Sequence, residues 1–138
     1  MEEREEFNSR LDEIRENLLL EIKNWWGHRF PGSMGTIITT NKEVYRYQFY
    51  NRKPDFIEGN CNFITKVRDL NDEEYSKIYA FIEDEIISKS YENRKMYDAG
   101  YIVSVNYNGI VRVIENNKGD ENNPEIYDTT EKLLKEII

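Results

Sequence analysis

The sequence predicts a single α+β domain, residues 1–138, in which an antiparallel sheet of about five strands carries helices packed mainly on one face. Two observations predict this fold class. Apolar residues recur at helical spacing in three segments, and β-branched and aromatic residues are concentrated between them. The resulting order is α-β-β-β-α-β-β-α, and a chain of 138 residues has the size of one domain.

The first predicted helix covers residues 3–26. Its apolar residues recur at spacings of three and four along one stripe: Phe7, Leu11, Ile14, Leu18, Ile22 and Trp25. Glutamates near the start of this segment suit the positive end of a helix dipole. Gly27 supplies a stop signal and Pro31 prevents continuation, so we expect the helix to end just before them.

Residues 36–50 are predicted to form a hairpin, because the first half is β-branched and the second half is rich in aromatic residues. A turn at Asn41-Lys42 places Thr39 opposite Val44. In this register the second half points three of its side chains away from the core: Arg46, Gln48 and Tyr50.

A third strand is predicted over residues 60–68 and is followed by a helix that begins at a capping box. Asn71 can cap this helix, and Glu74 stands at the position from which a carboxylate reaches back to the cap. Apolar residues at helical spacing then continue to about residue 88.

Residues 101–115 are predicted to form a second hairpin, for which two registers compete. A two-residue turn pairs Tyr107 with Ile110 and places Arg112 on the apolar face. A three-residue loop pairs Asn106 with Ile110 and points Arg112 outward. Because burial of an unpaired guanidinium is costly, we favour the three-residue loop.

A polar loop over residues 116–124 precedes the last predicted helix. Asp128 or Thr129 caps this helix, and apolar residues follow to Ile138.

The chain has one Cys and one His, which cannot form a structural zinc site, and the spacing of a calcium-binding loop is missing. We therefore expect no metal and no cofactor.

Charge is unevenly distributed along the chain, whose formal net charge is −8. Residues 1–24 hold 8 acidic and 4 basic side chains, whereas residues 25–68 hold 3 acidic and 7 basic side chains. An acidic surface attracts a basic protein partner and makes nucleic acid an unlikely ligand. We expect such a partner to contact acidic residues of the predicted helices and one tryptophan: Glu13, Glu16, Glu73, Glu83, Asp84 and Trp26.

A segment rich in aromatic residues and glycine, residues 25–35, contains the chain's single histidine. His28 could serve as an acid–base group, with Arg29, Tyr50 and Arg112 as the further candidates for a small active site. The segment lacks the lysine and the glycine pattern of a phosphate-binding loop. The structural interpretation, a turn that leads the chain into the sheet, is favoured over catalysis.

The composition indicates a cytoplasmic protein without contact to a membrane. The single Cys61 cannot form an internal disulfide, and the apolar runs are too short to cross a bilayer. The leading hypothesis is a non-enzymatic protein-binding protein, such as an immunity-type neutraliser of a basic toxin. The alternatives are a small enzyme with a site around His28 and a homo-oligomeric structural or regulatory protein.

Overall fold

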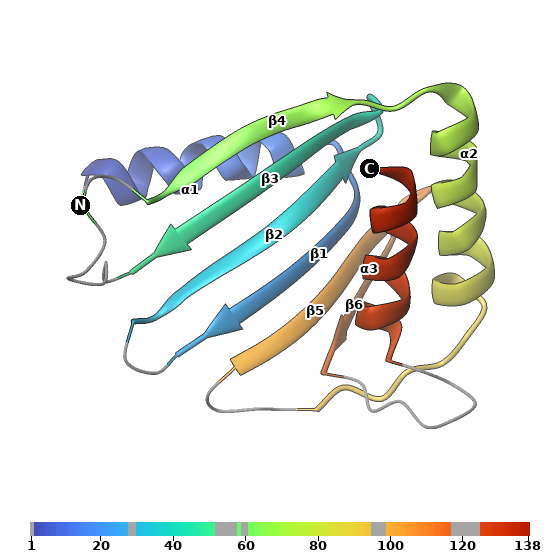
Figure 1. Ribbon diagram of the computed structural model, residues 1–138. Coiled ribbons are helices and arrows are strands. Elements are labelled where there is room, and N and C mark those ends of the chain that lie inside the picture. Colours follow the sequence, from blue (N-terminus) through green and yellow to red (C-terminus); the bar gives the residue numbers. More distant parts are fainter. Residues whose placement is uncertain (1, 28–29, 52–57, 59–60, 95–98, 117–124) are drawn as a thin grey trace.

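Six strands form one antiparallel sheet, and helices cover parts of both its faces (Figure 1). The computed structural model describes residues 2–27, 30–51, 58, 61–94, 99–116 and 125–138. The elements in chain order are α1 (Glu2–Arg15), β1 (Leu18–Trp26), β2 (Gly32–Thr39), β3 (Glu43–Tyr50), β4 (Phe63–Asp69), α2 (Asp72–Phe81), the π-helix η1 (Ile82–Ile87), β5 (Ala99–Tyr107), β6 (Ile110–Glu115) and α3 (Ile126–Ile137). The strands lie in the order β4-β3-β2-β1-β5-β6. The predicted α+β class is confirmed, with six strands instead of about five.

The helices cover different halves of the two faces of the sheet. On one face, α2, η1 and α3 form the larger core with the buried side chains of β1, β5 and β6 (Figure 1). On the opposite face, α1 packs against β2, β3 and β4, where Leu11 joins the buried Ile37, Tyr47 and Ile64. We call these the α3 face and the α1 face. On the α3 face, the part of β2, β3 and β4 that lies beyond α2 is not covered by any of the described helices.

The long helix predicted over residues 3–26 is wrong, because the chain leaves the helix at Arg15 and enters β1 at Leu18. Strand β1 lies between β2 and β5, and hydrogen-bonds to both. The apolar residues of this segment also fit a strand, and Leu20 and Ile22 are both buried on the α3 face. Pairing on both sides in the centre of the sheet therefore outweighs the helical spacing.

The hairpin of β2 and β3 has a register that differs by one residue from the prediction. Val44 pairs with Ile38 and not with Thr39. The loop accommodates this shift because Lys42 adopts a positive φ of 65° and the Thr39 hydroxyl accepts a hydrogen bond from the Glu43 amide. A shift of one residue moves every side chain of a strand to the other face of its partner. Thr36 and Ile38 of β2 therefore share a face with Val44 and Arg46 of β3.

The hairpin of β5 and β6 uses the two-residue turn, so the favoured three-residue loop is wrong. Tyr107 pairs with Ile110, and Asn108 and Gly109 both have positive φ, at 49° and 84°. Arg112 consequently lies on the α3 face.

The guanidinium of Arg112 is satisfied there by backbone carbonyls. It donates hydrogen bonds to the carbonyl oxygens of Ile86 and Lys89, and it lies 5.5 Å from the ring centroid of Tyr91. The end of a helix leaves carbonyls without intrahelical donors, and Arg112 supplies these donors at the end of η1. The cost that argued against this register is thus not incurred.

The capping box at the start of α2 is confirmed. Asn71 Oδ1 accepts a hydrogen bond of 2.8 Å from the Glu74 amide, and Glu74 Oε1 accepts one of 3.0 Å from the Asn71 amide. The helix continues through η1 to Ile87, close to the predicted end.

Candidate functional site

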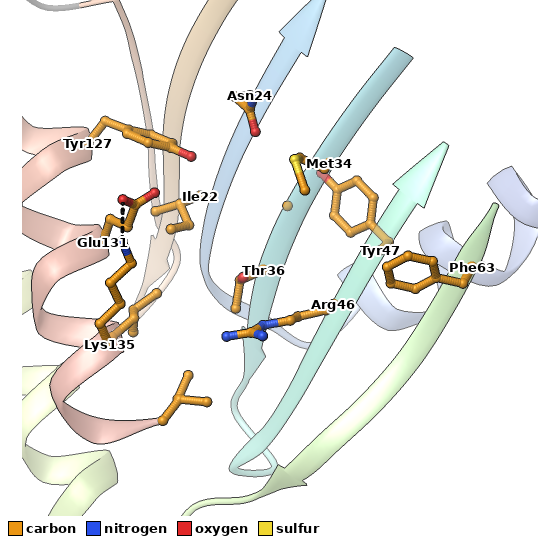
Figure 2. Close-up of a pocket in the computed structure, with 13 residues that line it drawn as sticks. Ile22, Asn24, Met34, Thr36, Arg46, Tyr47, Phe63, Tyr127, Glu131 and Lys135 are labelled. Atoms are coloured by element: carbon orange, nitrogen blue, oxygen red, sulfur yellow. Dashed lines mark hydrogen bonds and ion pairs between the residues drawn. The ribbon is translucent and has the colours of Figure 1, made fainter. Parts of the chain in front are cut away.

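A groove of about 240 Å³ lies on the α3 face, between helix α3 and the strands β1 to β4 (Figure 2). Its floor is the part of the α3 face that none of the described helices covers, and its wall is one side of α3. The lining side chains are Ile22, Asn24, Met34, Gly35, Thr36, Arg46, Tyr47, Phe63, Tyr127, Glu131, Leu134, Lys135 and Ile138.

The floor of the groove is built from rows of cross-strand neighbours. One row runs from Asn24 through Met34 and Gln48 to Phe63, each paired with the next across the sheet. Met34 and Phe63 are 40% and 42% exposed, although both are large and apolar. Methionine and aromatic residues are enriched in the cores of binding interfaces, so this row has the composition of a contact surface.

The wall is formed by three turns of α3. The ring of Tyr127 packs against Tyr101 of β5, with centroids 4.9 Å apart. Burial, together with the charge of Glu131, raises the pKa of Tyr127 to about 12, so its hydroxyl is protonated at neutral pH. One turn further along, Lys135 Nζ lies 3.1 Å from Glu131 Oε1, which balances the charge of this wall.

Arg68 connects β4 to the end of α3. Its Nη2 donates a hydrogen bond of 2.7 Å to the Ile137 carbonyl and also pairs with the Glu74 carboxylate. A single side chain thereby holds the C-terminal turn of α3 over the sheet, which keeps the wall of the groove in place.

Arg46 is the unpaired cation among the described residues that line this groove, since Lys135 is paired with Glu131. It is exposed, and its neighbours across the sheet, Thr36 and Thr65, carry no charge. Figure 2 shows its guanidinium pointing from β3 toward α3. Among the described residues it forms no ion pair, whereas Arg15 and Arg68 each contact a carboxylate.

A second polar cluster is buried on the α1 face. Glu21, which is 4% exposed, accepts two hydrogen bonds from Arg15, of 2.8 and 2.7 Å, and one of 2.5 Å from the Tyr47 hydroxyl. Burial raises the pKa of Tyr47, and the adjacent Glu21 carboxylate raises it further. Burial also lowers the pKa of Lys23, as does the nearby charge of Arg15.

The cluster fixes the end of α1 to two strands of the sheet. Gly35 makes it possible, because Tyr47 on β3 reaches Glu21 on β1 by crossing β2 at this residue. A Cβ atom at Gly35 would lie 2.6 Å from the Tyr47 hydroxyl oxygen and 2.7 Å from the Ile22 carbonyl oxygen. A saturated buried ion pair of this kind positions an element.

The residues proposed for a small active site are not assembled by the described part of the structure. His28 and Arg29 lie outside the described residues. Tyr50 is on β3 and Arg112 is on β6, and the strands β2, β1 and β5 lie between them. The guanidinium of Arg112 is also occupied by backbone carbonyls.

Trp26 has a structural role at the end of β1. Its Nε1 donates a hydrogen bond of 2.5 Å to the Phe30 carbonyl, and its ring packs edge-on against Tyr50, with centroids 5.5 Å apart. A Cβ atom at Gly32 would lie 2.9 Å from the indole, so the glycine lets this ring lie across β2. Trp26 is half-buried.

The acidic residues predicted to contact a partner are all exposed, but they lie on two sides of the molecule. Glu13 and Glu16 are at the end of α1, on the α1 face. Glu73, Glu83 and Asp84 are on α2 and η1, on the α3 face. The two groups therefore lie on opposite faces of the sheet (Figure 1).

The groove residues Met34 and Phe63 were not among the residues that the sequence singled out, and Arg46 was predicted only to point away from the core. Arg46 stands between two tyrosines in a strand, which marks it as a polar position but not as part of a groove. Its position opposite α3 depends on the register of β2 and β3 and on the packing of the last helix over β1 and β5.

Within the described residues, no group of three or more His, Cys, Asp or Glu side chains is arranged to hold a metal ion. The helices described here are also too short or too polar for any of them to cross a membrane. Comparison with protein-family models, with curated proteins and with solved structures finds no match for this chain.

Proposed function

We propose that this chain is a non-enzymatic binding protein whose partner is a basic protein, as expected for an immunity-type neutraliser of a basic toxin. The observation that carries the proposal is the group of exposed carboxylates Asp12, Glu13 and Glu16 at the end of α1. The ion pairs of the described residues include none of the three.

These carboxylates are placed against the preference of the helix. The C-terminal end of a helix carries the negative end of its dipole, where acidic side chains are unfavourable by about 0.3–1 kcal/mol each. Arg15, which is next to Glu16 in sequence, is turned inward to Glu21 and Tyr47. Their charge is therefore left for a contact outside the chain.

The carboxylates of α2 and η1 differ in this respect. Asp72 pairs with Lys42 at 2.5 Å, Glu74 pairs with Arg68, and Glu85 pairs with Lys89 at 2.6 Å. Glu83, in addition, accepts a hydrogen bond of 2.9 Å from the Tyr107 hydroxyl. Much of the charge on this side is already used within the fold, which favours α1 as the surface that meets the partner.

The test begins with affinity capture on the immobilised chain at low salt. A captured protein is then purified, and its dissociation constant is measured with the wild type and with the triple variant Asp12→Asn, Glu13→Gln, Glu16→Gln. The proposal predicts a basic partner and a loss of affinity of about tenfold or more in the variant, because charge pairs at an interface are removed.

The matched control carries Glu73→Gln, Asp84→Asn and Glu136→Gln, which change the net charge by the same amount on exposed residues elsewhere. We expect this control to keep its affinity within about threefold, since screened charges outside a contact act weakly. Failure to capture a basic protein contradicts the proposal. Equal losses in the two variants contradict the assignment to α1.

A further inference from the structure

The groove under α3 combines an unpaired guanidinium with apolar walls. Arg46 makes neither an ion pair nor a side-chain hydrogen bond within the described residues, and Figure 2 shows it pointing toward α3. A guanidinium is a planar fork of donors that matches a carboxylate in geometry as well as in charge. Arg46 therefore presents an anion-recognising group that the fold itself does not use.

Polar groups that could orient a ligand line the same groove as Arg46. The side chains of Asn24 and Thr36 lie on the floor, and neither has a hydrogen-bond partner among the described residues. The hydroxyl of Tyr127 points from α3 toward the sheet in Figure 2. A few polar groups that converge on a largely apolar cavity are typical of small-molecule sites.

The apolar part of the groove limits the rest of the ligand. Met34 and Phe63 stand on the sheet side, and Leu134 and Ile138 stand on the helix side. A volume of about 240 Å³ equals roughly eight water molecules at ~30 Å³ each. This is below the range of about 300–1,000 Å³ that drug-sized ligands occupy, so the occupant is small.

We propose that this groove binds a small organic carboxylate with an apolar body. The carboxylate pairs with the guanidinium of Arg46, and the apolar body packs between Met34 and Phe63 on one side and α3 on the other. Glu131 does not repel this ligand strongly, because Lys135 neutralises it at 3.1 Å. The site is independent of the proposed protein contact, since α1 lies on the opposite face of the sheet.

The experiment titrates the full chain with phenylacetate and, separately, with phenylacetamide, and follows backbone amide signals by NMR. Phenylacetamide has nearly the same shape but no charge. We expect phenylacetate to shift the amides of Thr36, Arg46 and Lys135 at millimolar concentration. Phenylacetamide should bind at least about tenfold more weakly than phenylacetate, because one charged pair is lost.

Two variants of Arg46 separate its charge from its geometry. Arg46→Gln should reduce phenylacetate binding by about tenfold, and Arg46→Lys should give an intermediate loss, because a lysine keeps the charge but not the fork. Arg10→Gln is the matched control, since Arg10 is also exposed but lies on α1, and it should bind as the wild type does.

Three results would overturn the proposal. These are an absence of shifts at millimolar phenylacetate, equal shifts with phenylacetamide, and shifts confined to residues outside the groove. A loss of binding in Arg46→Gln counts as support only if its amide spectrum without ligand matches that of the wild type away from β3. The result for Arg46→Lys, an exposed substitution that keeps the charge, then decides between a folding defect and a lost contact.

Discussion

The substitution Gly35→Ala should destabilise the protein strongly, although it adds only one methyl group. The added Cβ would lie 2.6 Å from the Tyr47 hydroxyl oxygen and 2.7 Å from the Ile22 carbonyl oxygen. The carbonyl belongs to the central strand β1 and cannot move without disturbing its pairing with β2 and β5. The phenol of Tyr47 must also give way, and it then leaves the carboxylate of Glu21.

The size of the effect follows from two contributions. Overpacking of a well-packed interior costs about 1–3 kcal/mol. Loss of the 2.5 Å hydrogen bond from Tyr47 to the buried carboxylate of Glu21 costs a further ~1–3 kcal/mol. We expect the free energy of unfolding to fall by about 2–6 kcal/mol, which is a large share of the stability of an ordinary domain.

The assay is urea unfolding followed by circular dichroism, with Gly109→Ala as the control. Gly109 also requires glycine, because its φ is +84°, but a Cβ there would meet nothing within 4 Å. That substitution should cost only about 1–2 kcal/mol, because a residue with a Cβ disfavours positive φ. A loss at Gly35 no larger than the loss at Gly109 would refute the role assigned to the crossing of Tyr47.

A double-mutant cycle checks the cause of the effect. In a Tyr47→Leu background the phenol that collides with the new methyl group is gone, so Gly35→Ala should cost less than in the wild type and keep only the cost of the contact with the Ile22 carbonyl. Coupled residues in contact show interaction energies of about 0.5–3 kcal/mol in such cycles. Strict additivity would mean that the carbonyl of Ile22 causes the loss, and that the buried cluster is not involved.

Two further predictions concern side chains that connect elements. Arg112→Met should lower the free energy of unfolding by about 1–3 kcal/mol, because the carbonyls of Ile86 and Lys89 lose their donor; unchanged urea unfolding would contradict this. A hydrogen bond from the Asn71 amide and the guanidinium of Arg68 hold the pKa of Glu74 below its ordinary 4.5. These two interactions stabilise the folded state at pH values above 4.5, and this stabilisation is lost as the pH falls through the lower pKa of Glu74 in the folded state. In unfolding curves measured at a series of pH values, the free energy of unfolding of Glu74→Gln should therefore fall less steeply at acidic pH than that of the wild type.

Features that depend on a few neighbouring residues could be predicted from the sequence. The capping box of Asn71 and Glu74 requires only the spacing of two side chains and the start of an apolar stripe. The dipeptide Asn108-Gly109 similarly indicates a turn, since both residues tolerate a positive φ. The α+β class follows from the order of such local signals.

Features that depend on distant partners could not be predicted in the same way. The segment from Leu18 to Trp26 has helical spacing, but it becomes a strand because β2 and β5 pair with both its edges. Arg112 was expected to avoid the apolar face, and it lies there because the end of η1 provides carbonyls. In both cases the deciding atoms are far away in sequence.

The candidate groove shows the same limit. Arg46 was predicted to point away from the core, but only the one-residue shift at Val44 and the packing of α3 reveal that it lines one cavity together with Met34 and Phe63. The sequence predicted that the acidic helices form a binding surface, but it did not predict how these helices lie relative to one another. The division of the sheet into two half-covered faces then assigns the carboxylates of α1 and of α2 to separate sides.

The dependence of partner affinity on salt tests the proposed function most directly. The dissociation constant of the captured basic protein is measured at low and at physiological ionic strength, with the wild type and with Asp12→Asn, Glu13→Gln, Glu16→Gln. If α1 carries the contact, the wild type loses affinity steeply as salt is added and the variant responds far less, because exposed charge pairs are screened. Equal salt dependence in the two proteins, or affinity that does not change with salt, would contradict the account.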